Sequence, residues 1–131
     1  MHYTSGMNAP TVIAICPSAD LSNGGLARKI PVRHAGEAAT AFFVRYQDKA
    51  YGYLNRCPHM GAELDWEGSV FTRAGDQLMC ARHGATFQPD TGTCTGGPCQ
   101  PSTLKGLDVF EAEQEGCAVV LWRPEGKTEP V

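Results

Sequence analysis

Residues 57–64 read CPHMGAEL and residues 80–87 read CARHGATF, and these two stretches decide how the chain is interpreted. Each places a cysteine two or three positions before a histidine and has a glycine soon after the pair. Two such loops offer two thiolates and two imidazoles. That donor set suits either a [2Fe–2S] centre with mixed ligands or a tetrahedral zinc ion. The glycines allow backbone N–H groups to come close and donate to sulfur atoms.

Short apolar runs flank the two loops, and no segment of ten or more residues has a convincing helical period. The chain contains 15 glycines and nine prolines, which favours many turns and short strands. The expected strands are Thr11–Cys16, Leu26–His34, Ala41–Tyr46, Ala50–Leu54, Gln77–Met79, Ala85–Gln88, Leu104–Glu111 and Cys117–Arg123. We therefore predict an all-β fold in which residues 1–131 form one domain. An antiparallel β scaffold at about 11–55 and 100–123 would carry an inserted, loop-rich subdomain at about 56–99.

Size and charge exclude several functional classes. A chain of 131 residues has room for one hydrophobic core. Its 11 basic and 14 acidic residues give a net charge of −3, which argues against binding of nucleic acid. The longest apolar run, Val12 to Cys16, is far shorter than the roughly 18 residues that a membrane span needs. Residues 1–10 lack the pattern of a secretory signal, so we expect a cytoplasmic protein without a membrane anchor.

The sequence holds six cysteines, at positions 16, 57, 80, 94, 99 and 117. In a reducing compartment this pattern favours a metal site over a disulfide framework. Cys94 and Cys99 flank a Gly-Gly-Pro turn, and we interpret them as small residues beside a shielding loop rather than as a disulfide or a second metal pair. Cys16 and Cys117 lie in strand-like runs and are interpreted as small buried hydrophobic residues.

Taken together, the motifs resemble the two cluster-binding loops of Rieske [2Fe–2S] proteins of the ferredoxin type. The resemblance extends to AYGYLNRCPH before the first loop, HGATFQPDTG after the second, and Gly97-Pro98 at the expected third loop. It implies a Rieske fold with one [2Fe–2S] cluster per chain. Cys57 and Cys80 would hold one iron, and His59 and His83 the other. The longer gap between His59 and Cys80 leaves the shape of the 63–76 connection open.

The function that the resemblance implies is one-electron transfer as a ferredoxin, with no catalytic residues in this chain. Electrons would come from a flavin-containing, NAD(P)H-linked reductase and pass to a terminal oxygenase of the aromatic-compound dioxygenase type. An oxygenase itself would need a second iron site with two histidines and a carboxylate. Beyond the predicted cluster ligands only His2 and His34 remain.

Two other functions stay open. The chain could be a small subunit or regulatory module of a larger reductase, similar to the small subunit of nitrite reductase. Such subunits often lack the four ligands, which this chain keeps. It could also be a zinc-stabilised interaction module, which metal analysis would reveal.

Several weaker features have plain interpretations. His34 is expected to be solvated in a turn, and the acidic residues Asp108, Glu111, Glu113 and Glu115 to form a solvated strand end and turn rather than a docking site for a basic partner. Met60, with Trp66 or Pro98, could supply apolar cover for the centre.

The resemblance also predicts a low reduction potential. High-potential Rieske proteins add a cysteine in each loop and two hydroxyl donors, a serine and a tyrosine. At the matching positions this chain has Ala62, Arg82, Ala85 and Phe87.

Overall fold

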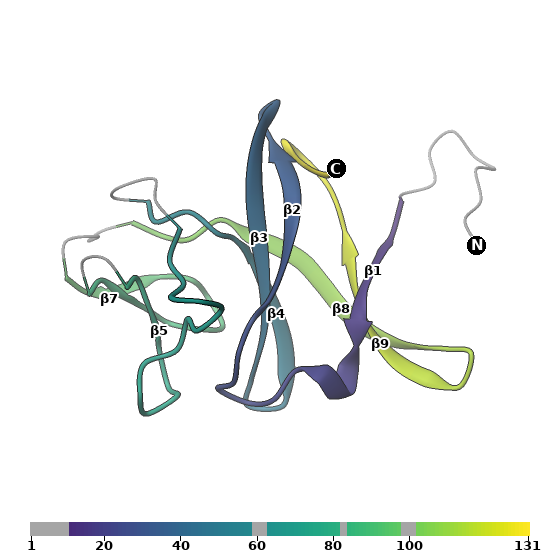
Figure 1. The fold of residues 1–131 in the computed structure, drawn as a ribbon, viewed down its shortest axis with the longest axis horizontal. Coiled ribbons are helices and arrows are strands. Elements are labelled where there is room, and N and C mark those ends of the chain that lie inside the picture. Colours follow the sequence, from purple (N-terminus) through teal and green to yellow (C-terminus); the bar gives the residue numbers. More distant parts are fainter. Residues whose placement is uncertain (1–10, 59–62, 82–83, 98–101) are drawn as a thin grey trace.

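The computed structural model describes residues 11–58, 63–81, 84–97 and 102–131 and is built almost entirely of strands (Figure 1). The strands are β1 (Ile13–Pro17), β2 (Arg28–His34), β3 (Glu37–Tyr46), β4 (Lys49–Leu54), β5 (Leu78–Met79), β6 (Thr86–Phe87), β7 (Cys94–Gly96), β8 (Gly106–Gln114), β9 (Cys117–Arg123) and β10 (Thr128–Pro130). A short 3₁₀ helix, η1 (Ser18–Asp20), follows β1. The predicted all-β class is therefore confirmed.

Two sheets organise the described part of the chain. Seven strands form the large sheet in the order β1-β9-β8-β4-β3-β2-β10, and β5-β6-β7 form a small one. Each pairing between these strands is antiparallel. In Figure 1 the small sheet lies to one side of β2, β3 and β4, away from β1 and β9. The segments that carry the predicted ligands thus leave the scaffold from β4 and return to it at β8.

Strand β3 separates two hydrophobic cores and contributes side chains to both. Its residues Ala41, Phe42, Phe43 and Val44 are all fully buried. Because side chains alternate between the two faces of a strand, Ala41 and Phe43 enter one core and Phe42 and Val44 the other. We call these the scaffold core and the loop-side core. The scaffold core also contains Cys16, Leu21, Val32, Ala50, Leu54, Val120 and Trp122, whereas the loop-side core contains the residues around the predicted metal ligands.

Some strand bounds differ from the sequence prediction. They do so where hydrogen bonding to a neighbouring strand, and not an apolar pattern in the sequence, makes the segment a strand. β3 begins at Glu37 rather than Ala41, because Glu37–Thr40 pairs with Pro31–His34 of β2 although EAAT lacks an alternating apolar pattern. The sequence does not predict β10, yet this strand continues the large sheet by pairing with Val32–His34. It does not predict β7 or η1 either. No helix among the described residues is long and apolar enough to cross a membrane.

Candidate metal centre

Cys57 and Cys80 lie in the same loop-side core, although 23 positions separate them in the sequence. Cys57 follows the end of β4 by three residues, and Cys80 comes directly after β5. Their exposed fractions are 1% and 0%, and both thiols are free. Buried thiols with no disulfide partner are what a metal centre at this place requires.

The buried side chain of Asn55 links the two ends of the segment that contains Cys57. The backbone N–H of Leu64 donates to Oδ1 of Asn55 over 2.8 Å, across a sequence separation of nine residues. The backbone N–H of Asn55 itself donates to the carbonyl oxygen of Thr40 in β3 over 2.8 Å. The first predicted ligand segment is therefore fixed at both ends to one residue, which in turn is fixed to the scaffold.

Asp65 extends this hydrogen-bond network from Asn55 to strand β2. Its carboxylate accepts hydrogen bonds from Asn55 Nδ2 (3.0 Å), the Gly68 backbone N–H (2.8 Å) and Lys29 Nζ of β2 (3.1 Å). Burial raises the pKa of Asp65, but these hydrogen bonds outweigh it and hold the pKa below its ordinary value. The ionised carboxylate is thus the form that joins the first ligand segment to β2.

Backbone hydrogen bonds link Cys80 to Gly84 and Ala85 and join its segment to the first one. The Cys80 N–H donates to the carbonyl oxygen of Ala85 over 2.8 Å, and the Gly84 N–H donates back to the Cys80 carbonyl over 2.9 Å. Gly84 has φ +74°, which glycine adopts at little cost. The Ala81 N–H donates to the carbonyl oxygen of Leu64 over 2.9 Å. This bond joins the two predicted ligand segments directly.

A third loop packs against the second. Gly97 has φ +86°, and a Cβ atom at this position would lie 2.9 Å from the Cα atom of Ala85. Only a residue without a side chain allows this approach. Beside it, the Oγ1 atoms of Thr86 and Thr95 are 2.9 Å apart, across the pairing of β6 with β7.

Two of the four predicted ligands lie among the described residues, and the structure brings Cys57 and Cys80 into one core. His59 and His83 lie outside the described residues, as do Met60, Ala62, Arg82, Pro98 and Cys99. Within the described part of the chain, no group of three or more His, Cys, Asp or Glu side chains could hold a metal ion. The two buried thiols and the dry core around them match the sulfur half of the donor set that a mixed-ligand cluster requires.

Several interpretations of single residues need correction. Trp66 is 70% exposed, so it does not provide apolar cover for a buried centre. Trp66 and Ser69 exchange two backbone hydrogen bonds of 2.9 Å, and Glu67 and Gly68 between them have positive φ. Cys16 is buried as expected, but Cys117 is exposed because it lies at the solvated end of the β8–β9 hairpin. Cys94 is disulfide-bonded, so its interpretation as an unpaired small residue is wrong.

Two members of the acidic stretch are engaged within the fold. Glu111 accepts hydrogen bonds from Arg45 of β3 at 2.6 and 3.2 Å, and these bonds lower the pKa of the Glu111 carboxyl group. Asp108 pairs with Arg123 of β9 at 3.0 Å. The acidic stretch is thus in part a structural feature of the large sheet.

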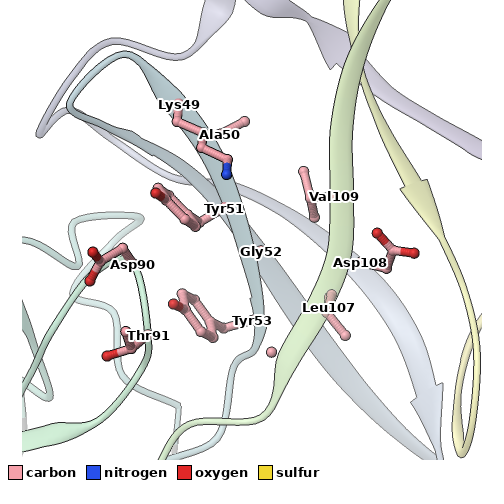
Figure 2. A pocket seen from close by; sticks show the side chains of 11 residues that line it. Lys49, Ala50, Tyr51, Gly52, Tyr53, Asp90, Thr91, Leu107, Asp108 and Val109 are labelled. Atoms are coloured by element: carbon pink, nitrogen blue, oxygen red, sulfur yellow. The ribbon is translucent and has the colours of Figure 1, made fainter.

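A groove of about 240 Å³ lies between β4, β8 and the loop at residues 90–91 (Figure 2). Tyr51 and Tyr53 point into it from β4 towards Asp90 and Thr91. Gly52 lies between them, and a Cβ atom there would come within 2.8 Å of Phe43 and Val109. The Tyr53 hydroxyl donates to the carbonyl oxygen of Pro89 over 2.7 Å, which fixes the loop. The residues that line the groove include no cysteine or histidine, so it is separate from the candidate metal centre.

The Asn55–Asp65–Lys29 network is the part of the site that the sequence does not predict. Asn55 stands two positions before Cys57, but an asparagine before a cysteine has no recognisable pattern, and Lys29 lies on a distant strand. Only the folded chain shows that these residues act together.

The sequence is similar to a known protein family and to individual proteins. Residues 11–111 match the family described as Rieske [2Fe-2S] domain. Ferredoxin CarAc of Metapseudomonas resinovorans is 33% identical over 101 residues, which are 77% of this chain and 83% of that protein. An oxygenase component of a chloroacetanilide N-alkylformylase from Rhizorhabdus wittichii is 34% identical over 91 residues, but the match spans only 23% of its length.

Two solved structures are similar to the fold. The ferredoxin of carbazole 1,9a-dioxygenase from Nocardioides aromaticivorans superposes with a TM-score of 0.64 and 25% identity, over 88% of this chain and 99% of that one. A chain in a complex of reduced oxygenase and oxidised ferredoxin in carbazole 1,9a-dioxygenase gives a TM-score of 0.62 and 26% identity, over 90% and 99% of the two chains.

Proposed function

Because this chain belongs to the Rieske [2Fe–2S] domain family, we propose that Cys57, His59, Cys80 and His83 hold its cluster and that it works as a one-electron carrier. Membership of the family means that the protein carries a [2Fe–2S] cluster. In our proposal the two thiolates bind one iron and the two imidazoles the other. The segment at about 56–99 would form the cluster-binding subdomain of one domain spanning residues 1–131.

The observation that supports this proposal best is that two buried, free thiols lie in one core, on two segments that hydrogen-bond to each other. Cys57 and Cys80 are both almost fully buried, and the Ala81–Leu64 bond joins their segments. Burial alone does not indicate a metal ligand, because a free cysteine is often a small buried core residue, and Cys16 is a buried free thiol of the scaffold core. The hydrogen bond between their two segments distinguishes Cys57 and Cys80 from Cys16.

When bound, the cluster accepts and releases one electron without taking part in covalent chemistry. The chain's own residues exclude water from the thiols and fix their segments. Leu64, Leu78 and Phe87 are fully buried beside them in the loop-side core. A dry, hydrogen-bonded surround sets the potential of such a centre and limits its reorganisation on electron transfer.

We further propose that the electron acceptor is a terminal oxygenase of the aromatic-compound dioxygenase type and that the donor is a flavin-containing, NAD(P)H-linked reductase. The acceptor is supported by the ferredoxin names of two relatives and by the structure in which a related ferredoxin occurs in a complex with its oxygenase. The chain would be a component of a multicomponent dioxygenase and not itself an enzyme. Its cytoplasmic location remains a prediction.

Metal and sulfide analysis tests the ligand proposal. We expect about two irons and two acid-labile sulfides per chain and the EPR signal of a mixed-ligand cluster in the reduced protein. Cys57→Ser and Cys80→Ser should lose both, whereas Cys16→Ser, which removes a buried free thiol from the scaffold core, should keep them. A colourless wild type with one zinc per chain would instead support a zinc-stabilised module.

Electron transfer tests the carrier role. The reduced protein should transfer one electron to the purified terminal oxygenase of a carbazole-type dioxygenase, as followed by the visible spectra of both proteins. Stable co-purification with a large reductase subunit, without transfer to the oxygenase, would favour the small-subunit alternative.

A further inference from the structure

Three basic residues act electrostatically on His34, which is the last residue of β2 before the hairpin to β3. The sequence predicts a solvated His34, but the residue is half-buried, and its Nδ1 lies 2.9 Å from Thr128 Oγ1. Burial lowers the pKa of His34, and the positive charges of Arg56, Lys105 and Lys127 lower it further. The acidic residue that acts on it in the opposite sense is Glu37, directly across the hairpin.

Backbone hydrogen bonds bring these basic residues together from three distant parts of the chain. The carbonyl oxygen of Lys127 accepts the N–H of Ala35 in the β2–β3 turn over 2.9 Å. The carbonyl oxygen of Lys105 accepts the N–H of Leu54 at the end of β4 over 3.0 Å. Arg56 follows two residues later. The three positions are therefore fixed relative to one another by the sheet.

None of these three side chains has an acidic partner within 4.0 Å among the described residues. The basic residues that form ion pairs within the described residues are Arg28, Lys29, Arg45 and Arg123. Lys105 and Lys127 are exposed and Arg56 is half-buried. We call Arg56, Lys105 and Lys127 the basic surface. Its sign is opposite to the net charge of −3 of the whole chain.

Two residues of the basic surface lie next to the segment that carries Cys57. Arg56 is the neighbour of Cys57 in the sequence, and Lys105 is hydrogen-bonded to the strand that leads into that segment. An electron-transfer partner must bring its own centre close to this end of the molecule. Unpaired charges on the flank of such a contact site steer a partner of opposite charge and raise its association rate.

We propose that the basic surface docks an acidic patch on the terminal oxygenase, beside the acceptor centre of that protein. The inference rests on the proposed function, and it adds the side of this chain that the acceptor approaches and the charge that the acceptor presents there. Exposed ion pairs of this kind add little to affinity. They act chiefly on the rate of association, which salt screens over about 10 Å at 0.1 M.

The test is the second-order rate constant for electron transfer from the reduced wild-type protein and its variants to the purified carbazole-type oxygenase, measured by stopped flow at several ionic strengths. Lys105→Gln/Lys127→Gln should lower this constant roughly three- to tenfold at low ionic strength, with the difference vanishing at high salt. Arg56 is left unchanged because it adjoins a predicted ligand. The matched control is Lys49→Gln. Lys49 also lacks an ion pair among the described residues, but it lies at the opposite end of β4 and 5.6 Å over the Tyr51 ring.

The outcomes separate this proposal from the proposed function. If the wild type transfers electrons at a rate that is insensitive to salt, or if Lys49→Gln slows transfer as much as the double variant does, the docking surface is wrong and the carrier role stands. If the double variant slows only reduction by the reductase, the surface serves the donor, and our assignment to the oxygenase is wrong. If the wild type transfers no electron to the oxygenase, both proposals fail. The visible spectrum and the reduction potential of each variant should match those of the wild type.

Discussion

The side-chain oxygen of Asn55 accepts the backbone N–H of Leu64 over 2.8 Å, so that a buried amide spans the segment around Cys57. The exposed fraction of Asn55 is 4%, and its Nδ2 donates to Asp65. Asn55→Ala should therefore leave a buried N–H without a partner and a carboxylate with one donor fewer. We expect it to lower the free energy of unfolding by about 1–3 kcal/mol. Cluster absorbance should also be lost at a lower denaturant concentration than in the wild type.

Asn23 provides a matched control, because it makes the same pair of bonds on the surface. Its side chain accepts the backbone N–H of Asp48 over 2.7 Å and donates to the Asp48 carboxylate over 2.9 Å. Asn23→Ala should have a smaller effect on unfolding and none on the cluster. Equal loss of cluster absorbance in the two variants would contradict the special role of Asn55.

Asp65 makes the stability of the fold depend on pH in the acid range. Its pKa is lowered in the folded state, so the unfolded chain binds more protons between the two pKa values. The contribution of Asp65 is thus complete above its ordinary pKa of 3.8 and is lost as the pH falls through the folded pKa. Asp65→Asn should lower the midpoint of urea unfolding at pH 7 and flatten its decline below about pH 4.

The corresponding control is Asp20→Asn. Asp20 pairs with Arg28 at 2.9 Å, but both side chains are more than 40% exposed, so the pair contributes little. If Asp65→Asn and Asp20→Asn gave the same pH profile, the buried network would not be the source of the acid sensitivity.

The sequence predicts those parts of the fold whose signal is local. Strands β3 and β4 carry aromatic and β-branched runs, and the Cys–His spacing predicts both ligand segments from local sequence alone. β10 has no such signal, since it is a three-residue edge strand whose sequence is Thr-Glu-Pro, and only its pairing with β2 makes it a strand. β7 is similarly short, and it is a strand through its pairing with β6 and the bond from the Cys94 N–H to the Ser102 carbonyl.

Single residues are harder to interpret because their burial depends on distant partners. Cys117 and Cys16 look alike in sequence, yet one lies at a hairpin end and the other lies with Trp122 in the scaffold core. Trp66 is 70% exposed at a turn in which the next two residues, Glu67 and Gly68, have positive φ. The Asn55–Asp65–Lys29 network combines three segments, so no sequence window contains it.

Gly97 tests the contact between the second and third loops. Gly97→Ala would place a methyl group 2.9 Å from the Cα atom of Ala85, at φ +86°. The matched control is Gly116→Ala in the β8–β9 turn, with φ +85° and no atom within 4 Å of its Cβ position. Both variants incur a backbone cost of about 1 kcal/mol. Only Gly97→Ala should also displace the segment after Cys80, broaden the cluster EPR signal and speed cluster loss. An unchanged EPR signal would show that the third loop does not support the centre.

The last prediction concerns the reduction potential. Ala85 and Phe87 are both fully buried in the loop-side core. At the matching positions, high-potential Rieske proteins carry a serine and a tyrosine whose hydroxyl groups donate to sulfur. A hydroxyl donor stabilises the more electron-rich reduced state, so its absence lowers the potential. We therefore expect a wild-type potential near −150 mV, at the lower end of the Rieske range.

Ala85→Ser and Phe87→Tyr should each raise that potential, as measured by protein-film voltammetry. A gain of about 1 kcal/mol in the reduced state corresponds to a shift of roughly 40 mV, since a tenfold change for one electron is about 1.4 kcal/mol or 59 mV. Ala50→Ser, which adds the same hydroxyl in the scaffold core, should leave the potential unchanged. A shift in Ala50→Ser as large as that in Ala85→Ser would point to a general effect of core polarity. A wild-type potential well above zero would contradict transfer from a flavin reductase to an oxygenase, because a donor of low potential could then reduce the protein but the protein could not readily pass the electron on.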